Sequence, residues 1–436
     1  MQYTRDQVLQ LAPDDASAKA GQQLANHAKW VTKSMHSKAL WGDCQGSGKT
    51  PYITIIDLQN IAFKCSCPSR KFPCKHGLGL LLLYSQQSDV FTKSEELPQH
   101  VSEWLNKREG KEAAKELKET GPPDEAAQAK RIAAREKKVD AGIEELRLWI
   151  KDAVRTGIMN VPQNSYRFSQ NITARMVDAQ AGGLANQLRQ IHNIHFYEEG
   201  WHRALIKRLS GIYLITEAFR HIDMLPQEMA KEIQTLIGWI TTKEEVLQGT
   251  PVRDTWVVLS VSVTEDQNLS TEKIWLYSLT EKRFALLLHF YAASQIPQHF
   301  LFPGLHIEAD VVFFPGLTPL RALIKEQRTV PATGIQIEAD HSVQSVYHKI
   351  TAQLAQNPFA EQIPFLLNNV QVTFRDKTWL LYDHDKQGFA IANPEEACWR
   401  ILAFTRGKAF SCFGIYENEQ FSIHTLWSPD KTYFIK

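Results

Sequence analysis

The sequence predicts an α+β chain of several domains, with a small hairpin-plus-helix module, a helical middle region and an antiparallel β-rich C-terminal domain. Three observations predict it: cysteines and a histidine gather between residues 65 and 76, apolar residues then recur at helical spacing, and after Pro251 they alternate along the chain. A length of 436 residues exceeds what one core usually organises, and an apolar content of 43% supports several cores. We expect a first module at 1–92, a charged helical linker at 93–140, a helical domain at 141–248 and a β-rich α+β domain at 249–436.

Two short helices and a loop are expected to open the chain. Thr4–Gln7 has the form of a capping box, and Pro13–Asp15 begins a second helix. The apolar spacing of that helix consists of Leu24, Ala28 and Val31. Trp41–Gly48 is rich in glycine, which favours a loop.

A hairpin and a buried helix are predicted next. Tyr52–Ile56 has the pattern of a strand, and the chain is expected to return through Ile61–Phe63. This return places Cys65 and Cys67 at the end of the second strand. Cys74–Gln86 is predicted to be helical, so that His76 lies in its first turn.

Four side chains in this module have the spacing of a metal site. Cys65 and Cys67 form C-x-C, and six residues later Cys74 and His76 form C-x-H. Three thiolates and one imidazole suit a closed tetrahedral site, so we expect one structural Zn²⁺ per chain. The alternative is a redox pair of Cys65 and Cys67, which a reducing cytoplasm disfavours.

These residues resemble a known family. The C-x-C-x₆-C-x-H order, after a Trp-Gly loop and a hairpin, is similar to the SWIM zinc finger across Trp41 to Leu83, with the four ligands at Cys65, Cys67, Cys74 and His76. The layout also resembles bacterial multidomain SWIM proteins. The resemblance implies a finger that binds DNA or other proteins, and partners among MoxR-type AAA+ ATPases and von Willebrand A-domain proteins.

Basic side chains crowd around the predicted metal site. Between Lys29 and His76 the sequence has eight Lys or Arg against two Asp, with Trp30 and Trp41 nearby. Such clusters suit phosphate backbones and stacked bases, whereas the simpler interpretation is that they balance the negative zinc centre. The candidate binding residues are Lys49, Lys64, Arg70, Lys71 and Lys75.

The helical region has four apolar stripes, and one neighbouring cluster of polar residues has the side chains of a possible second metal site. A heptad-like stripe is formed by Ile132, Val139, Ile143, Leu146, Ile150 and Ala153, and further stripes by Leu184, Leu188, Ile191 and His195, by Leu205, Leu209, Ile212 and Thr216, and by Ile233, Leu236, Ile237 and Ile240. A second metal at His192, His195, Glu199 and His202 would need one helix to continue through Gly200, so surface histidines are the simpler interpretation.

Hairpins dominate the prediction for the C-terminal part. Val370–Phe374 and Trp379–Tyr382 flank one turn, and Phe410–Tyr416 and Phe421–Trp427 flank another. Asp383, His384 and Asp385 have the side chains of an acid–base catalytic cluster. The simpler interpretation is that they form a solvated turn. Cys398 and Cys412 are expected to be buried thiols.

No motif for catalysis stands out. Gly46–Thr50 resembles the end of a phosphate-binding loop, but its first glycine is one place out and Pro51 follows where a helix is needed. We expect a non-enzymatic zinc protein, an adaptor that binds DNA or a protein partner; the alternative is an enzyme with an unrecognised site in the β-rich domain. Without an evident signal peptide or apolar span, the chain is expected in the cytoplasm, away from membranes.

Overall fold

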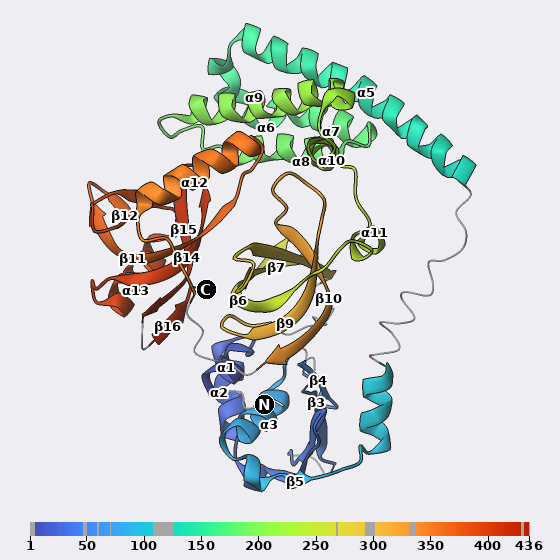
Figure 1. Cartoon of the computed structure of the whole chain (residues 1–436), viewed down its shortest axis with the longest axis vertical. Coiled ribbons are helices and arrows are strands. Elements are labelled where there is room, and N and C mark those ends of the chain that lie inside the picture. The colour runs from blue at the N-terminus through green and yellow to red at the C-terminus, as the bar shows by residue number, and fades with distance from the viewer. Residues whose placement is uncertain are drawn as a thin grey trace.

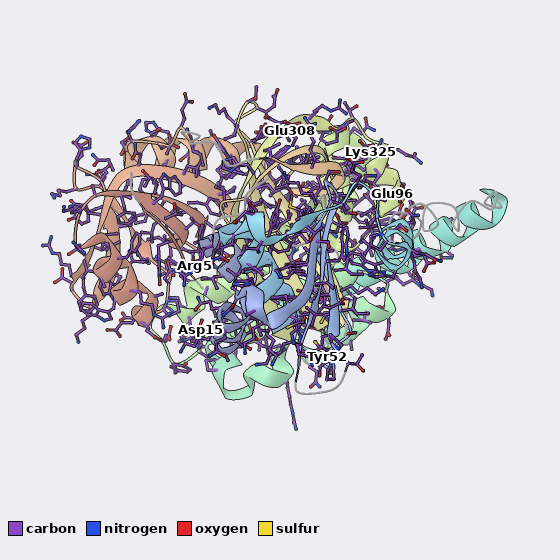
Figure 2. The ribbon with its side chains drawn as sticks, turned by 90° about the horizontal axis from the view of Figure 1, so that it is seen from below. Arg5, Asp15, Tyr52, Glu96, Glu308 and Lys325 are labelled. Carbon is purple, nitrogen blue, oxygen red and sulfur yellow. The ribbon has the colours of Figure 1, made fainter. Side chains whose placement is uncertain are left out.

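The computed structural model describes residues 5–46, 50–58, 61–69, 71–107, 125–266, 269–292, 301–330, 337–428 and 431–435. The N-terminal module and a helical bundle lie at opposite ends of a β-barrel, and the C-terminal domain lies beside the barrel (Figure 1). Seen from the end that carries the module, the module lies over the barrel (Figure 2). The predicted α+β class, with a helical middle and a β-rich C-terminal part, is confirmed.

A five-stranded sheet and three helices form the N-terminal module. Its strand order is β4-β3-β2-β1-β5, and every pairing is antiparallel except that of β1 with β5. The Asp14 side chain caps α2 by accepting from the Ser17 N–H (2.7 Å). The elements are α1 (Arg5–Gln10), α2 (Asp15–Leu24), η1 (His27–Lys29), β1 (Trp30–Met35), β2 (Ala39–Cys44), β3 (Tyr52–Asp57), β4 (Ala62–Cys65), α3 (Lys75–Gln86), η2 (Ser88–Val90) and β5 (Thr92–Lys93).

Two local expectations in this module are wrong. Trp41–Gly48 is not a loop throughout, because β2 runs to Cys44. At Gly42 a side chain would meet the Thr32 carbonyl oxygen at 2.7 Å, so the glycine is there for close packing of strands rather than for a turn. The second helix ends at Leu24, and the residues expected to continue its stripe lie in η1 and β1.

A helix at residues 99–107 covers the outer face of this sheet. Val101 and Leu105 are buried there against Trp41 and Ile55. The start of the predicted charged linker therefore packs on the module, whereas residues 108–124 lie outside the described residues.

Helices of the middle region pack into a bundle. The elements are α5 (Glu125–Thr156), η3 (Ile158–Asn164), α6 (Ser165–Phe168), α7 (Gln170–Asp178), α8 (Gly182–Arg189), η4 (Gln190–Asn193), α9 (Trp201–Arg220), η5 (Ile222–Met224) and α10 (Gln227–Ile237), and α11 (Lys243–Leu247) leads to the barrel. The stripes on α5 and α9 are buried as predicted, apart from half-buried Ala153 and Ile132, whose side chain is not described. The prediction that Ile240 belongs to the stripe of Ile233 is wrong, because Ile240 lies beyond α10 and is 81% exposed.

An ion pair lies inside the bundle. The Arg147 guanidinium is buried and donates to the Glu217 carboxylate (2.5 Å), and it also lies over the Tyr213 ring. The hydrogen bond from Arg147 is the main cause that lowers the pKa of Glu217 to about 2.

This ion pair predicts a pH dependence. Because the folded pKa of Glu217 lies below its usual value of 4.5, the ionised carboxylate stabilises the bundle above that pH and stops doing so as the pH falls toward 2. Glu217→Gln should therefore be less stable than the wild type at pH 7, and the difference should shrink as the pH falls from about 4.5 and vanish only below pH 2. Urea unfolding followed by helical circular dichroism at several pH values tests this. A difference that does not depend on pH would contradict it.

A closed five-stranded barrel forms the centre of the molecule. It consists of β6 (Val252–Asp266), β7 (Leu269–Ser278), β8 (Phe284–Ala292), β9 (His306–Phe313) and β10 (Arg321–Val330). Around the barrel the order is β10-β8-β7-β6-β9, with β8 and β10 parallel. The fourth strand thus returns beside the first, the Greek-key arrangement of OB-fold barrels. One continuous cluster of buried apolar side chains joins the barrel interior to the module, from Leu80 of α3 to Trp256 of β6.

The C-terminal domain is a six-stranded sheet with two helices. Both predicted hairpins are present, with positive-φ residues in the turns at Asp376–Lys377 and Asn418–Glu419. Its elements are α12 (Val343–Gln356), β11 (Ile363–Arg375), β12 (Thr378–Tyr382), β13 (Gly388–Ile391), α13 (Glu395–Thr405), β14 (Phe410–Glu417), β15 (Gln420–Ser428) and β16 (Lys431–Phe434). Cys398 and Cys412 are buried, as expected.

The C-terminal domain packs against the outer face of the barrel. Trp275 of β7 and Phe284 of β8 each place their ring 5.9 Å from the ring of Phe413 on β14. The Thr425 hydroxyl donates to the Leu259 carbonyl across the same interface (2.5 Å). Local sequence patterns do not predict this contact, because the residues that form it are between 129 and 166 positions apart.

Candidate metal centre

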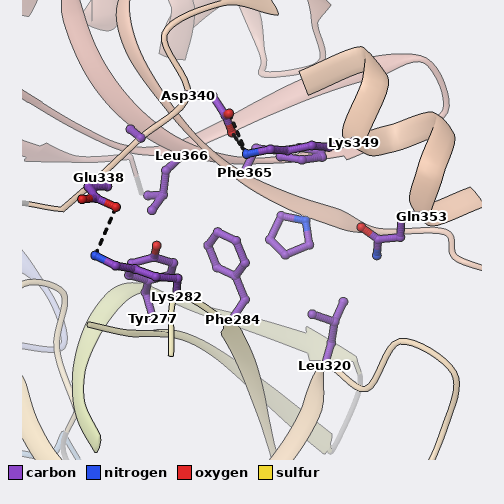
Figure 3. A pocket seen from close by; sticks show the side chains of 12 residues that line it. Tyr277, Lys282, Phe284, Leu320, Glu338, Asp340, Lys349, Gln353, Phe365 and Leu366 are labelled. Atoms are coloured by element: carbon purple, nitrogen blue, oxygen red, sulfur yellow. Dashed lines mark hydrogen bonds and ion pairs between the residues drawn. The ribbon is translucent and has the colours of Figure 1, made fainter. Parts of the chain in front are cut away.

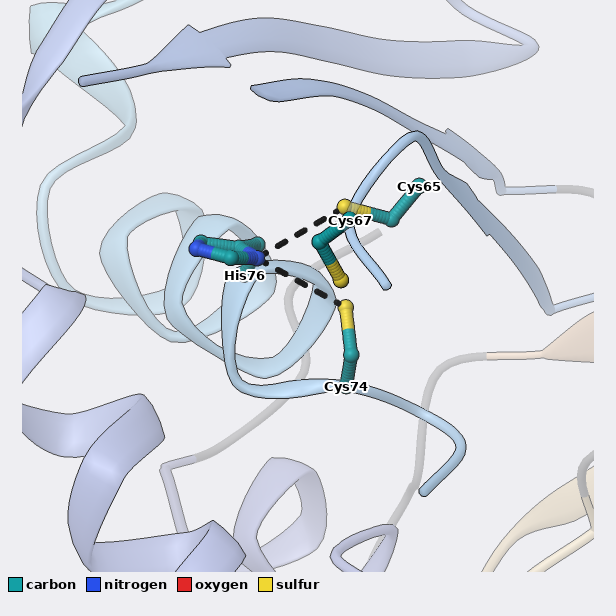
Figure 4. A group of neighbouring side chains, drawn as sticks. All are labelled: Cys65, Cys67, Cys74 and His76. Carbon is teal, nitrogen blue, oxygen red and sulfur yellow. Dashed lines mark hydrogen bonds between the residues drawn. The ribbon is translucent and has the colours of Figure 1, made fainter. Parts of the chain in front are cut away.

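The hairpin and α3 bring the four predicted ligand residues together (Figure 4). Cys65 is the last residue of β4, Cys67 follows it, Cys74 is the N-cap residue of α3, and His76 lies in the first turn of that helix. Cys74 and His76 are buried, whereas Cys65 and Cys67 are half-buried. The hairpin and the helix are thus placed as the sequence predicts.

The distances among these side chains fit a tetrahedral zinc ion. The three Sγ atoms and the histidine nitrogen all lie within 4.8 Å of one another. The His76 Nδ1 atom is 3.6 Å from the Sγ of Cys65 and 4.0 Å from that of Cys74. Usual zinc–sulfur and zinc–nitrogen bond lengths put such atoms about 3.6 Å apart. The donor set and its spacing therefore suit Zn²⁺, which would cross-link the hairpin to the helix.

Neighbouring groups orient the four side chains. Backbone N–H groups of Cys67, Ser69 and Gly77 donate to the sulfurs of Cys65, Cys67 and Cys74 respectively. The Thr54 hydroxyl is 3.4 Å from the Cys65 sulfur, and the Tyr52 ring packs on the His76 ring at 4.8 Å. Such partners hold ligands in place and stabilise negative charge on sulfur. Sequence spacing did not reveal Thr54 or Tyr52, because they come from the opposite strand of the hairpin.

The three sulfurs hold their protons unequally. A hydrogen bond from Cys74 is the main cause that lowers the pKa of Cys65 to about 3, and the same bond raises the pKa of Cys74. Burial raises the pKa of Cys67. Zinc needs thiolates, so its binding would release the protons that the three sulfurs still hold.

Comparison with protein families identifies the module. Residues 64–85 match the family described as SWIM zinc finger. The chain carries a SWIM zinc finger. Residues 134–237 match the SWIM-associated four-helix bundle domain, which corresponds to the bundle from α5 to α10. No curated protein matches the chain. No helix in the described part of the chain is long and apolar enough to cross a bilayer.

The predicted basic residues have different surroundings. Lys64 on β4 and Lys75 on α3 are exposed, and in sequence they lie next to Cys65 and between Cys74 and His76 respectively. Lys71 is exposed and paired with Asp14 (2.6 Å), and this bond is the main cause that lowers the pKa of Asp14 to about 2. Lys49 and Arg70 lie outside the described residues.

The two tryptophans expected beside these cations are not available for stacking. Trp30 is 3% exposed and Trp41 is 8% exposed, because both pack into cores of the module. The expected flat aromatic surface for bases is therefore wrong. Apolar exposure on this sheet instead comes from Val31 on β1 and Ile53 on β3.

Other candidate sites are not assembled. A turn at 194–200 separates α8 from α9, so the proposed second metal residues do not share one helix, and within the described ranges the cysteine–histidine cluster is the one group that could hold a metal. The buried Asp383 carboxylate accepts the N–H groups of Val343, Asp385 and Gln387, whereas His384 is exposed. The lookalike of a phosphate loop includes residues 47–49, which lie outside the described residues.

Proposed function

We propose that this chain is a non-enzymatic adaptor whose SWIM finger binds DNA or a protein partner, while the C-terminal part docks a second component. One structural zinc per chain would hold the finger in shape. The observation that carries this proposal is the position of Lys64 and Lys75, two exposed cations beside the metal cluster that form no ion pair with another described residue. Cations in this position can contact phosphates or acidic side chains.

Each kind of partner has its own support. The exposed lysines favour DNA, since phosphate contacts supply most of the affinity in sequence-independent binding. The support for a protein is the exposure of Val31 and Ile53 on the same sheet, because a protein partner would remove this apolar surface from water. The resemblance to bacterial SWIM proteins suggests MoxR-type ATPases and von Willebrand A-domain proteins as the protein partners. The use of Asp383 as a backbone acceptor supports the non-enzymatic part of the proposal.

One experiment distinguishes DNA from protein. Tagged full-length chain is used to capture partners with and without nuclease, and DNA binding is measured by fluorescence anisotropy over a range of salt concentrations. If DNA is the partner, captured proteins are lost after nuclease. The double change Lys64→Glu and Lys75→Glu should then lower the slope of log K against log salt by about two, one for each phosphate contact.

Lys325→Glu is the matched control, because Lys325 is exposed on the barrel, outside the finger (Figure 2). Partners that survive nuclease but are lost in the double variant identify a protein as the finger's target. If the double variant keeps both DNA and protein binding, the finger surface is not the binding site and the proposal fails.

A further inference from the structure

A cavity of about 460 Å³ lies where the barrel meets the C-terminal domain (Figure 3). The barrel contributes Tyr277 and Phe284, the C-terminal domain contributes Gln353 of α12 and Phe365 of β11, and the segment 338–340 closes one side. This volume is within the range of small-molecule sites and is large enough for one nucleotide.

Aromatic side chains form the floor. The rings of Tyr277 and Phe284 are 5.0 Å apart at 52°, and Phe365 approaches from the other domain. Tyr277 and Phe365 are buried and support the floor from behind, whereas Phe284 is half-buried and is the ring that the cavity leaves accessible. Rigid aromatic faces of this kind stack on planar rings such as nucleobases.

Polar groups at the rim differ in how firmly they are held. Lys349 is 2.6 Å and 2.9 Å from the two carboxylate oxygens of Asp340, which also accepts the Ser345 hydroxyl (3.2 Å). Lys282 and Glu338 are paired more loosely at 3.4 Å, and both side chains are exposed. An exposed pair contributes little free energy, so Lys282 can exchange Glu338 for a ligand anion at small cost. The Gln353 amide offers a donor and an acceptor to the same space.

The cavity lies on the part of the barrel surface that binds ligands in OB-fold barrels. Tyr277 and Phe284 belong to the second and third strands of the barrel, and Leu320 ends the loop between the fourth and fifth strands. In OB-fold barrels this strand face and this loop bind oligonucleotides and oligosaccharides. Here Leu366, Phe413 and Ile415 of the C-terminal domain pack on that face, so the room left beside them is that of the cavity, which suits a single unit rather than a strand laid across the face.

We propose that this cavity binds one nucleotide, with its base against the aromatic floor, the Gln353 amide on the base edge and the phosphate at Lys282. Adenine is the expected base, because a glutamine amide matches its adjacent donor and acceptor. The nucleotide can be free or can be one unit of a single strand. The site is separate from the finger and does not depend on the function proposed for it.

Calorimetric titration of the full-length protein with AMP and with an oligomer of twelve deoxyadenylates tests the proposal. Gln353→Ala should weaken AMP binding about tenfold, as loss of a two-bond base contact does. Lys282→Gln should also weaken AMP binding and should leave adenosine binding unchanged, because adenosine has no phosphate. Gln344→Ala on the exposed side of α12 and Lys325→Ala on the barrel are the matched controls, and neither should change AMP binding.

The outcomes separate the two sources of the nucleotide. AMP binding that is sensitive to both cavity variants indicates a free nucleotide. Binding of the oligomer alone, with the same sensitivity, indicates a unit of a strand. If neither probe binds, if oligomer binding ignores Gln353→Ala, or if maltotriose binds in their place, the proposal is overturned.

Discussion

Cys74→Ala is expected to abolish zinc binding and to unfold the finger segment between β4 and the start of α3. Three ligands from Cys65, Cys67 and His76 leave one corner of a closed site open to water. Structural zinc contributes on the order of 10–16 kcal/mol in isolated fingers, which is more than most domains have in total stability. Zinc content measured by mass spectrometry and limited proteolysis of residues 61–77 would show the change.

Cys44→Ala is the matched control for this prediction. Cys44 is a fully buried thiol of the same sheet, but it is not part of the ligand cluster. It should keep about one zinc per chain, as expected for one closed site. The bundle should keep its helical signal in both variants, because its core is a separate cluster of side chains. A Cys74→Ala protein that retains its zinc and resists protease would contradict the role assigned to the metal.

Phe413→Ala is expected to destabilise the contact between the barrel and the C-terminal domain. Phe413 is fully buried, and its ring packs on those of Trp275 and Phe284. Truncation of a buried phenylalanine costs about 3–5 kcal/mol, because the lost apolar contacts leave a cavity. Urea unfolding followed by tryptophan fluorescence should show an earlier transition, with the emission of Trp275 shifted to the red.

The matched control is Phe374→Ala in the same domain. Phe374 is 47% exposed on β11, so the same change in chemistry removes much less buried surface. We expect a loss well below that of Phe413→Ala, since exposed sites usually change stability little. Equal losses at the two positions would show that the interface does not depend on the Phe413 ring.

Short-range patterns predicted the finger and the helix faces well. The hairpin, the helix and the meeting of Cys65, Cys67, Cys74 and His76 follow from residues less than twenty-five positions apart. Errors arose where a local pattern competes with packing. Gly42 suggested a loop, but it lies in a strand. The residue at this position is glycine because a larger residue would meet the neighbouring strand.

Surface predictions failed for a similar reason. Trp30 and Trp41 were expected to present flat faces beside the lysines, yet both are buried in cores that other segments of the module help to form. In the case of Trp41, the cover is the helix at 99–107, which lies in a segment expected to be linker. Burial depends on which segments meet, and alternation along one strand does not contain that information.

The sequence by itself predicted which four side chains of the finger gather as possible metal ligands, because this depends on the chemistry and spacing of a few nearby residues. It also determined the helical and β-rich regions, because the period of apolar residues differs between helix and strand. Only the tertiary structure decided that the β-rich region holds a closed barrel, that Phe413 packs on Trp275 and Phe284 of that barrel, and that a cavity remains beside this contact. These features depend on contacts between residues far apart in the chain, for which the free energy comes from burial that no local pattern specifies.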